Sequence, residues 1–157
     1  MRRIERSVVI KAPLEKVYGF TVDWRNLQRY FDYIHEVKPV TDKTVGSGTR
    51  LRLKVKQLGR IWDIEWEVTE HIENVVWAFI QTDKLGQKSI KRYRFTRVDD
   101  STRLTFTAEY KPPPVIGYMI AVLFLEPQWR KLYDRAFEKL KSLIEADMAS
   151  PATSQRL

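Results

Sequence analysis

Cysteine is absent from the 157 residues, and histidine and glycine are scarce. Without a thiol there is no disulfide scaffold, no thiolate metal site and no cysteine nucleophile, and we expect a cytoplasmic location. The two histidines, His35 and His71, have no partner at metal-ligand spacing, and the six glycines form no phosphate-binding loop. We therefore expect neither a metal nor a cofactor, and no catalytic residue is assigned.

Long hydrophobic runs are also missing. The chain begins without the apolar stretch of a signal peptide. The longest apolar run, residues 115–125, would rise only ~16 Å as a helix, about half the hydrocarbon thickness of a bilayer. We interpret this run as a lid over a pocket entrance that touches an anionic membrane surface. A dimer contact is the alternative, so a monomer or a homodimer is expected.

Charge is present in excess but is not concentrated. The net charge is +8, from 28 basic and 20 acidic residues, and no block of five lysines or arginines occurs. A solvated basic surface is the simplest interpretation, and we expect no specific nucleic-acid partner. A basic nucleic-acid-binding module remains the third functional alternative.

The first thirty residues predict a strand followed by two short helices. Residues 3–11 are typical of a strand, and Pro13 suits the first turn of a helix over 13–22. Asp23 is placed to cap a second short helix, whose apolar residues are Trp24, Leu27, Tyr30 and Phe31.

The middle of the chain alternates with a period of two. Residues 49–57 and 61–69 each combine one apolar face with one charged face, and a short hairpin turn at 58–60 separates them. The outer face is basic in the first strand (Arg50, Arg52, Lys54, Lys56) and acidic in the second (Asp63, Glu65, Glu67). Antiparallel pairing would place opposite charges across the ladder and help fix the register.

Three more strands and one long helix complete the expected domain, residues 1–146. The strands cover 75–82, 89–98 and 102–111, although the apolar residues on both faces of 75–82 leave its register open. Residues 129–145 have the pattern of an amphipathic helix with one face for a sheet. Residues 147–157 are expected to form a flexible tail. The fold class is therefore α+β, with about seven antiparallel strands curved around the long helix.

A sheet coiled around one helix leaves room for a pocket between them. Aromatic side chains dominate the strand faces that point inward. Lys91 lies on the same strand face as Tyr93 and Phe95, so we expect it to point inward and to anchor an acidic or carbonyl head group. The predicted ligand-binding residues are Trp24, Tyr30, Phe31, Leu53, Trp62, Trp66, Trp77, Phe79, Lys91, Tyr93, Phe106, Tyr118, Val122, Trp129 and Tyr133.

The order of several short motifs resembles one protein family. The stretch RSVVIKAPLEKVY from Arg6 to Tyr18, the Asp23 segment after it, and STRLTF from Ser101 resemble the START-like (SRPBCC) superfamily. The resemblance covers residues 3–146, with Ser101 where glycine is usual. It implies the helix-grip fold and the polyketide cyclase/dehydrase and lipid-transport group, whose members bind lipids, quinones or polyketides. The family has no common catalytic motif to transfer.

Two functions follow from this interpretation. The first is a non-enzymatic carrier of a small hydrophobic molecule, held by burial of apolar surface and oriented by one or two polar groups. The alternative is a polyketide aromatase/cyclase-like enzyme that acts on a poly-carbonyl substrate in the same pocket. An inward-facing polar pair would favour the enzyme, and a dry pocket would favour the carrier.

Overall fold

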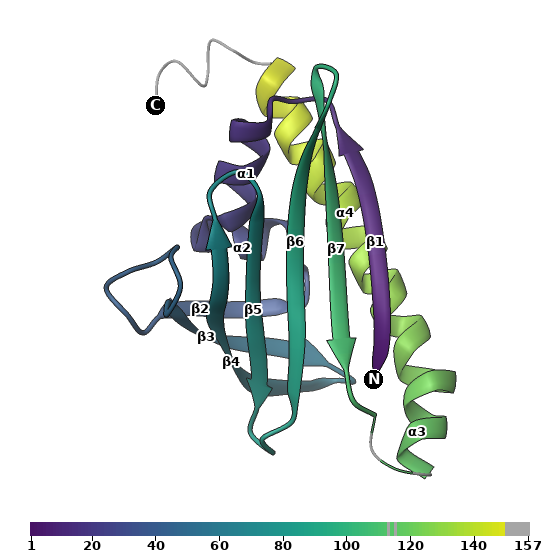
Figure 1. Ribbon diagram of the computed structural model, residues 1–157. Helices are drawn as coiled ribbons and strands as arrows, with labels where there is room; N and C mark the ends of the chain where they lie inside the picture. The colour runs from purple at the N-terminus through teal and green to yellow at the C-terminus, as the bar shows by residue number, and fades with distance from the viewer. Residues whose placement is uncertain (113, 115, 150–157) are drawn as a thin grey trace.

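The computed structural model describes residues 1–112, 114 and 116–149 (Figure 1). The expected α+β architecture is confirmed: seven antiparallel strands curve around a long C-terminal helix. The strands are β1 (Arg2–Ile10), β2 (Ile34–Pro39), β3 (Arg50–Gln57), β4 (Arg60–Ile72), β5 (Val76–Asp83), β6 (Lys88–Val98) and β7 (Ser101–Tyr110). The helices are α1 (Leu14–Val22), η1 (Trp24–Asn26), α2 (Leu27–Tyr30), α3 (Ile116–Ile120), η2 (Ala121–Leu125) and α4 (Glu126–Ala149).

The strands pair in the order β1-β7-β6-β5-β4-β3-β2. The first strand of the chain, β1, therefore lies beside the last, β7. In Figure 1, β2, β3 and the first part of β4 cross at a steep angle to β5, β6, β7 and β1, whereas the last part of β4 runs beside β5. The helix α4 lies along one face of the curved sheet. The short helices α1 and α2 contact α4 beside its C-terminal half. Asp23 caps η1 as expected, because its Oδ1 accepts the Arg25 backbone N–H at 3.0 Å.

The charge pattern of the β3–β4 hairpin is confirmed. Arg50 lies opposite Glu67, Arg52 opposite Glu65, and Lys54 opposite Asp63. The Arg50 guanidinium donates to Glu65 Oε1 at 2.8 Å. The pairing also puts Leu51, Leu53 and Val55 together on the concave face, where they are buried.

A β-bulge in β4 changes which face its last residues occupy. The register shifts between Val68 and Glu70, so one residue has no opposite partner. Val68 faces Phe79 before the bulge, and His71 faces Trp77 after it. The alternation predicted for 61–69 holds up to Val68, and the bulge then adds one residue and reverses the parity of the residues that follow it.

The long helix extends beyond the predicted 129–145 at both ends. Its buried face consists of Tyr133, Ala136, Phe137, Leu140 and Ile144, as the amphipathic pattern predicts. At its N-terminal side it continues without a break into the π-helical turn η2 and then α3. At its C-terminal side it reaches Ala149, and residues 150–157 of the expected tail lie outside the described residues. No helix in the described part of the chain is both long and apolar enough to cross a bilayer.

Candidate functional site

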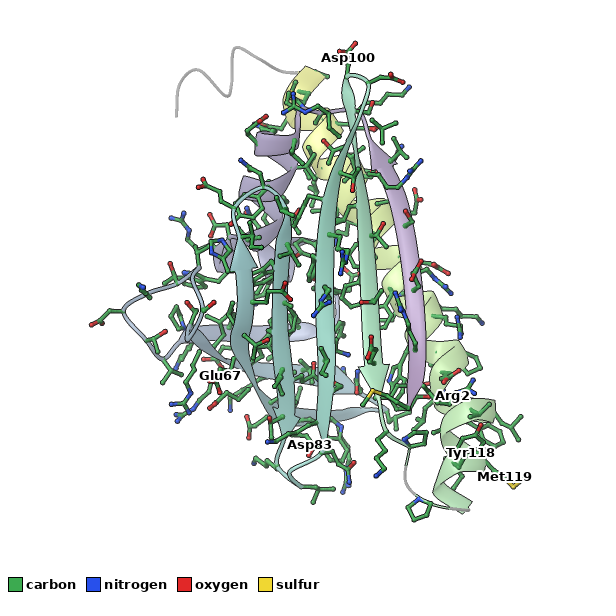
Figure 2. All side chains as sticks on the ribbon, viewed as in Figure 1. Arg2, Glu67, Asp83, Asp100, Tyr118 and Met119 are labelled. Atoms are coloured by element: carbon green, nitrogen blue, oxygen red, sulfur yellow. The ribbon has the colours of Figure 1, made fainter. Side chains whose placement is uncertain are left out.

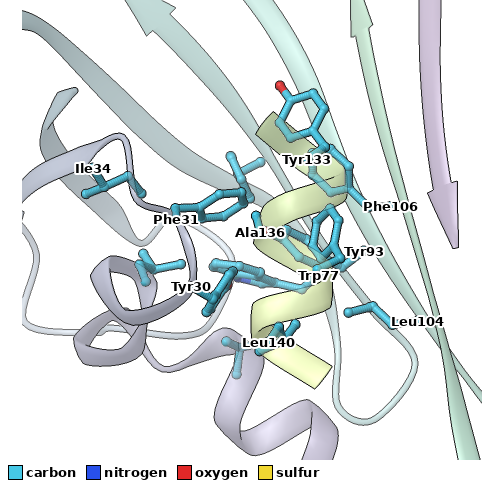
Figure 3. Close-up of a cluster of buried hydrophobic side chains, with 14 of the residues drawn as sticks. Tyr30, Phe31, Ile34, Trp77, Tyr93, Leu104, Phe106, Tyr133, Ala136 and Leu140 are labelled. Carbon is cyan, nitrogen blue, oxygen red and sulfur yellow. The ribbon is translucent and has the colours of Figure 1, made fainter. Parts of the chain in front are cut away.

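The concave side of the sheet carries a continuous aromatic layer (Figure 3). Trp77 on β5 lies directly opposite Tyr93 on β6, which in turn lies opposite Phe106 on β7. These side chains project toward α4 because residues in register on neighbouring strands point to the same face. All three are buried. The layer is therefore a direct product of strand alternation and register.

Ring contacts connect this layer to the helices. Trp66 stacks on Phe79 with ring centroids 4.1 Å apart, and the Tyr93 and Phe106 centroids are 5.1 Å apart. From Phe106 the contacts continue to Tyr133 at 4.8 Å and to Phe137 at 5.0 Å, both on α4. The first pair is stacked, the second is edge-on and the last two are tilted, and none of these rings stands isolated from its neighbours. Side chains therefore occupy the concave interior where the pocket was expected.

Lys91 places an ammonium group inside this aromatic interior. Its residue is only 8 % exposed, and it lies opposite Phe79 on one side and Ala108 on the other. Its Nζ donates to the Tyr133 hydroxyl at 2.9 Å and lies 5.4 Å from the centre of the Tyr133 ring. No carboxylate pairs with Lys91 among the described residues. An ammonium has three donors, so two remain for another acceptor.

Two further donors in the same layer have no acceptor among the described residues. The Trp77 Nε1 and the Tyr93 hydroxyl are buried and form no hydrogen bond of normal geometry, although the Tyr93 hydroxyl lies beside Tyr30. The neighbouring polar groups are satisfied, since the Tyr30 hydroxyl donates to the Thr21 carbonyl at 2.9 Å and the Trp66 Nε1 to Gln81 at 3.1 Å. Buried polar groups in proteins are almost always hydrogen-bonded. The interior thus offers donors to which an acceptor can bind.

Burial also fixes the protonation of the phenols. It raises the pKa of Tyr93 well above its ordinary value and raises that of Tyr30 as well. Both side chains stay protonated at neutral pH, because a phenolate is poorly solvated in an apolar environment. They can donate a hydrogen bond but cannot act as a negatively charged base. A negative or acceptor group on a ligand would suit this environment better than a positive one.

Most of the predicted ligand-binding residues meet in this interior, and five do not. Those brought together are Tyr30, Phe31, Leu53, Trp66, Trp77, Phe79, Lys91, Tyr93, Phe106 and Tyr133. Trp62 is exposed near the β3–β4 turn, where its Nε1 donates to the Gln57 carbonyl at 3.2 Å. It shares the parity of Trp66, but it lies too near the hairpin end to join the rings around α4. Tyr118 is exposed on α3, and Val122 and Trp129 are half-buried on the helix that follows.

Two hollows lie outside the aromatic interior. One of about 410 Å³ is lined mainly by charged side chains of β2, β3 and β4 and also by Leu53 and Ile64. The other, of about 680 Å³, lies between α1, η1, the 40–49 loop and the β4–β5 turn, and Trp24 lines it. Neither is lined by Lys91 or Tyr133. The internal pocket itself therefore stays a prediction.

The second hollow contains a polar pair that sequence reasoning missed. The Tyr18 hydroxyl and His71 Nε2 are hydrogen-bonded, and the two rings stack with centroids 6.0 Å apart. Burial, followed by the charge of Glu73, raises the pKa of Tyr18. His71 reaches this position because of the β4 bulge, which turns it to the side occupied by α1. No local pattern marks a bulge in this sequence, so His71 looked like an isolated surface residue.

A second missed cluster surrounds Glu126 at the start of α4. This buried carboxylate accepts two hydrogen bonds from the Arg2 guanidinium, at 2.6 and 3.0 Å, and one from the Tyr110 hydroxyl. Arg130 lies 3.6 Å away on the same helix. The hydrogen bonds from Arg2 lower the pKa of Glu126 to about 2. The cluster fixes the ends of β1 and β7 to the helix, and 124 positions separate its two main partners. No His, Cys, Asp and Glu cluster suited to a metal occurs in the described part of the chain.

Comparison with known proteins places this architecture in a family. The family described as polyketide cyclase / dehydrase and lipid transport has a model that matches residues 1–145. No curated protein matches the chain.

Solved structures share the fold at low sequence identity. The Zhui aromatase/cyclase from Streptomyces has a TM-score of 0.78 and 18 % identity, over 94 % of this chain and 95 % of that one. The protein TTHA0849 from Thermus thermophilus has a TM-score of 0.76 and 20 % identity, over 92 % of this chain and 98 % of that one. Ara h 8.0201 has a TM-score of 0.67 and 12 % identity, over 92 % and 98 % of the two chains. The likeness extends over nearly the whole of each molecule.

Proposed function

Because the chain belongs to the polyketide cyclase/dehydrase and lipid-transport family, a hydrophobic-ligand-binding fold, we propose that it binds a small hydrophobic molecule between the sheet and α4. The molecule would be a lipid, a quinone or a polyketide-like compound that ends in a carbonyl or carboxylate group. The protein would carry or sequester this molecule in the cytoplasm.

One observation carries this proposal: unused hydrogen-bond donors within an aromatic interior. They are two of the Lys91 ammonium protons, the Trp77 Nε1 and the Tyr93 hydroxyl. A buried donor without a partner costs about 1–3 kcal/mol, and more when it is charged. A ligand oxygen next to Lys91 would recover the part of this energy that belongs to the ammonium, and the surrounding rings would bury the hydrocarbon part of the ligand at ~25 cal/mol per Å².

Ligand entry requires the interior rings to move. Phe106 and Tyr133 contact each other beside Lys91, so they would have to rotate or separate to admit a chain. A gap between the sheet and α4 could open on binding, because the interior is filled mainly by side chains of these two elements. Proteins commonly populate such minor open conformations and are shifted toward them by a ligand.

A second function, catalysis, is supported by the Lys91–Tyr133 pair. A buried ammonium that donates to a phenol at 2.9 Å is an inward-facing polar pair, the feature expected of a cyclase-like enzyme. Such a pair could polarise a substrate carbonyl and donate a proton to its oxygen during aldol cyclisation of a poly-carbonyl chain, while water accepts the α-proton of the attacking carbon. The Zhui aromatase/cyclase shares the fold. A shared fold does not determine the chemistry of this chain, which an assay has to decide.

Isothermal titration with two amphiphiles of equal chain length tests the binding proposal. Dodecanoic acid presents an acceptor to Lys91, whereas dodecylamine presents a second cation. We expect the acid to bind at least about tenfold more tightly, as one charge-assisted hydrogen bond implies. Lys91→Met should remove this preference, and Lys56→Met, a change at an exposed lysine on β3, should keep it. Equal affinity of the wild-type protein for both amphiphiles would contradict the proposal.

A separate assay distinguishes the carrier from the enzyme. A synthetic poly-β-keto thioester would be incubated with the protein and its cyclised product sought by mass spectrometry, as loss of one water. Turnover that Tyr133→Phe abolishes, with dodecanoic acid binding preserved, would establish catalysis. Binding without turnover would establish the carrier.

A further inference from the structure

The helical segment before α4, residues 116–125, exposes an unusual amount of apolar surface. Side chains of this arm that are largely in solvent include Tyr118, Met119, Ile120, Leu123 and Phe124, and Phe124 is 63 % exposed. The arm contains no charged residue. A protein that works alone in water rarely exposes such a contiguous patch, so the patch marks an interaction surface.

The arm projects past the end of the sheet, as the position of Tyr118 and Met119 in Figure 2 shows. It continues directly into α4, and its Tyr118 contacts Arg2 at the start of β1, where the guanidinium lies 3.4 Å from the Tyr118 hydroxyl. Within it, the buried Ala121 starts the π-helical turn η2. A π-helical turn adds a residue, which changes the direction in which the preceding side chains point, and such turns are often functional. The arm is therefore held in place by α4 while its outer side chains stay uncovered.

A second apolar side chain lies at the same end of the molecule. The β5–β6 turn carries Leu85, which is 80 % exposed. In Figures 1 and 2 this turn, near the labelled Asp83, and the arm both extend to the lower limit of the molecule. The Asp83 carboxylate is used within the turn, where it accepts the Leu85 and Gln87 backbone N–H groups at 2.9 Å. One flat surface could therefore meet both apolar elements.

Basic residues surround these two elements. Lys84 and Lys88 flank Leu85, Lys111 precedes the arm, and Lys131 follows it on α4. Lys88, Lys111 and Lys131 are exposed and form no ion pair among the described residues. The nearest helical carboxylate, Glu126, is buried and already neutralised by Arg2. Asp83 in the turn and Glu109 near Lys111 carry negative charges that offset part of this positive charge. This end of the molecule therefore combines apolar side chains with a modest excess of positive charge.

We propose that the arm and the β5–β6 turn together dock on the surface of an anionic lipid bilayer. Apolar side chains would enter the interface while lysines bind lipid phosphates, the arrangement of interfacial helices. A second copy of this chain is a poorer occupant, because its own lysines would meet these. A carrier that docks here would reach its lipid-borne ligand directly, but the docking itself does not depend on the proposed ligand binding.

Co-sedimentation with vesicles tests the docking surface. We expect the protein to bind phosphatidylcholine vesicles that contain phosphatidylserine, and to bind pure phosphatidylcholine vesicles far more weakly. Phe124→Glu should weaken binding about tenfold or more, since a charge would replace a phenylalanine that enters the bilayer interface. Lys88→Glu should weaken it about fivefold or more, from loss of one attraction at the surface. Added salt should release the protein.

Matched variants elsewhere on the molecule provide the controls. Val75→Glu alters a 51 % exposed side chain in the β4–β5 turn, which lies at the opposite end of the molecule in Figure 1. Lys43→Glu makes the same charge change as Lys88→Glu, in the loop between β2 and β3. Both should bind vesicles like the wild type, and so should Lys91→Met, which separates this test from ligand binding.

Three results would overturn the proposal. They are absence of binding to the anionic vesicles, equal binding to both vesicle types, and equal losses in the control variants. Sedimentation velocity adds a fourth: a dimer that Phe124→Glu dissociates would assign the patch to a second copy of this chain.

Discussion

Lys91 is deeply buried and has one neutral hydrogen-bond partner, the Tyr133 hydroxyl. We therefore expect its ammonium group to lower the stability of the folded protein, and a substitution can test this. An ammonium in an apolar environment is stabilised far less than in water, and one phenol does not replace its hydration. Lys91→Met keeps a similar length and volume and removes the charge. The Tyr133 hydroxyl loses a donor, which costs about 1 kcal/mol, but the larger desolvation penalty disappears.

We therefore expect Lys91→Met to leave the free energy of unfolding unchanged or to raise it by up to ~2 kcal/mol. Urea denaturation at neutral pH would measure this change. A loss larger than about 1 kcal/mol would mean that Lys91 is structural and would argue against a role for it in binding. A residue that lowers the stability of the folded protein is typical of a functional site, where function and stability conflict.

Glu126 makes a pH-dependent contribution with a definite sign. Its pKa is lowered from its usual 4.5 to about 2, mainly by hydrogen bonds from Arg2. A lowered folded-state pKa adds stability above the unfolded pKa, and that stability is lost as the pH falls from 4.5 toward about 2. Arg2 is one-third exposed, so solvent screening reduces the effect.

We expect Glu126→Gln to lower the free energy of unfolding by about 2 kcal/mol at neutral pH. The gap between wild type and variant should narrow at about pH 3, because below the unfolded pKa of 4.5 the unfolded chain binds a proton that the folded carboxylate, with a pKa of about 2, does not. Urea denaturation of both proteins at the two pH values measures the gap. A gap that stays constant would show that the Arg2 interaction contributes nothing through charge.

Among the secondary-structure elements, the β3–β4 turn has a strained backbone conformation that a single substitution could relieve. Leu58 has φ +54° and Gly59 has φ +73°, so both central residues are in the left-handed region. Glycine adopts this conformation freely, but in leucine the Cβ atom clashes with the backbone and lowers stability. Asparagine is the usual residue at this position of a two-residue hairpin. Leu58 is 64 % exposed, so its side chain contributes little packing.

Leu58→Asn should therefore raise the free energy of unfolding by about 0.5–1 kcal/mol, measured as a shift of the urea midpoint with an unchanged slope. Leu85→Asn is the matched control, because Leu85 is also an exposed turn leucine but has no positive φ. It should leave the midpoint nearly unchanged. Equal shifts in both variants would attribute the effect to lost surface hydrophobicity.

The elements that alternate cleanly could be predicted from the sequence, and those that depend on distant contacts could not. Leu51, Leu53 and Val55 share a face because a strand has a period of two, and Arg50 meets an acidic partner because β4 has complementary charge. Trp77 and Phe79 had an open register, which pairing with Tyr93 and Lys91 resolves. The inward direction of Lys91 followed from parity alone.

The missed features have a common physical cause. His71 depends on a bulge that reverses parity within β4, and Glu126 depends on an arginine at the other end of the chain. Trp62 has the right parity but lies at the wrong end of its strand. Periodicity reports which face a side chain occupies. It does not report how far along the strand the opposing helix extends, nor which distant side chains come together.

At the scale of the whole molecule, the net charge of +8 raises the question of nucleic acids. Many of the cations are used by carboxylates on the same surface. Arg50 pairs with Glu65, Arg92 with Glu70 and Arg97 with Glu15, and Lys139 on α4 pairs with Asp32. Other cations, among them Lys43, Lys88 and Lys111, form no ion pair in the described part of the chain, but no run of five basic residues gathers them into one groove. Counterion release grows with the number of phosphates bound at one site.

We expect only weak, sequence-independent binding of duplex DNA that is lost by about 0.15 M salt, with a logarithmic salt slope smaller than about 4. Gel shifts of one random duplex over a salt series measure both quantities. Lys43→Glu and Lys88→Glu should reduce this binding to a similar small extent, because each removes one dispersed charge. In vesicle binding the two variants should differ. A steep slope that depended on one of these lysines would identify a phosphate-binding groove and make nucleic acid the principal partner.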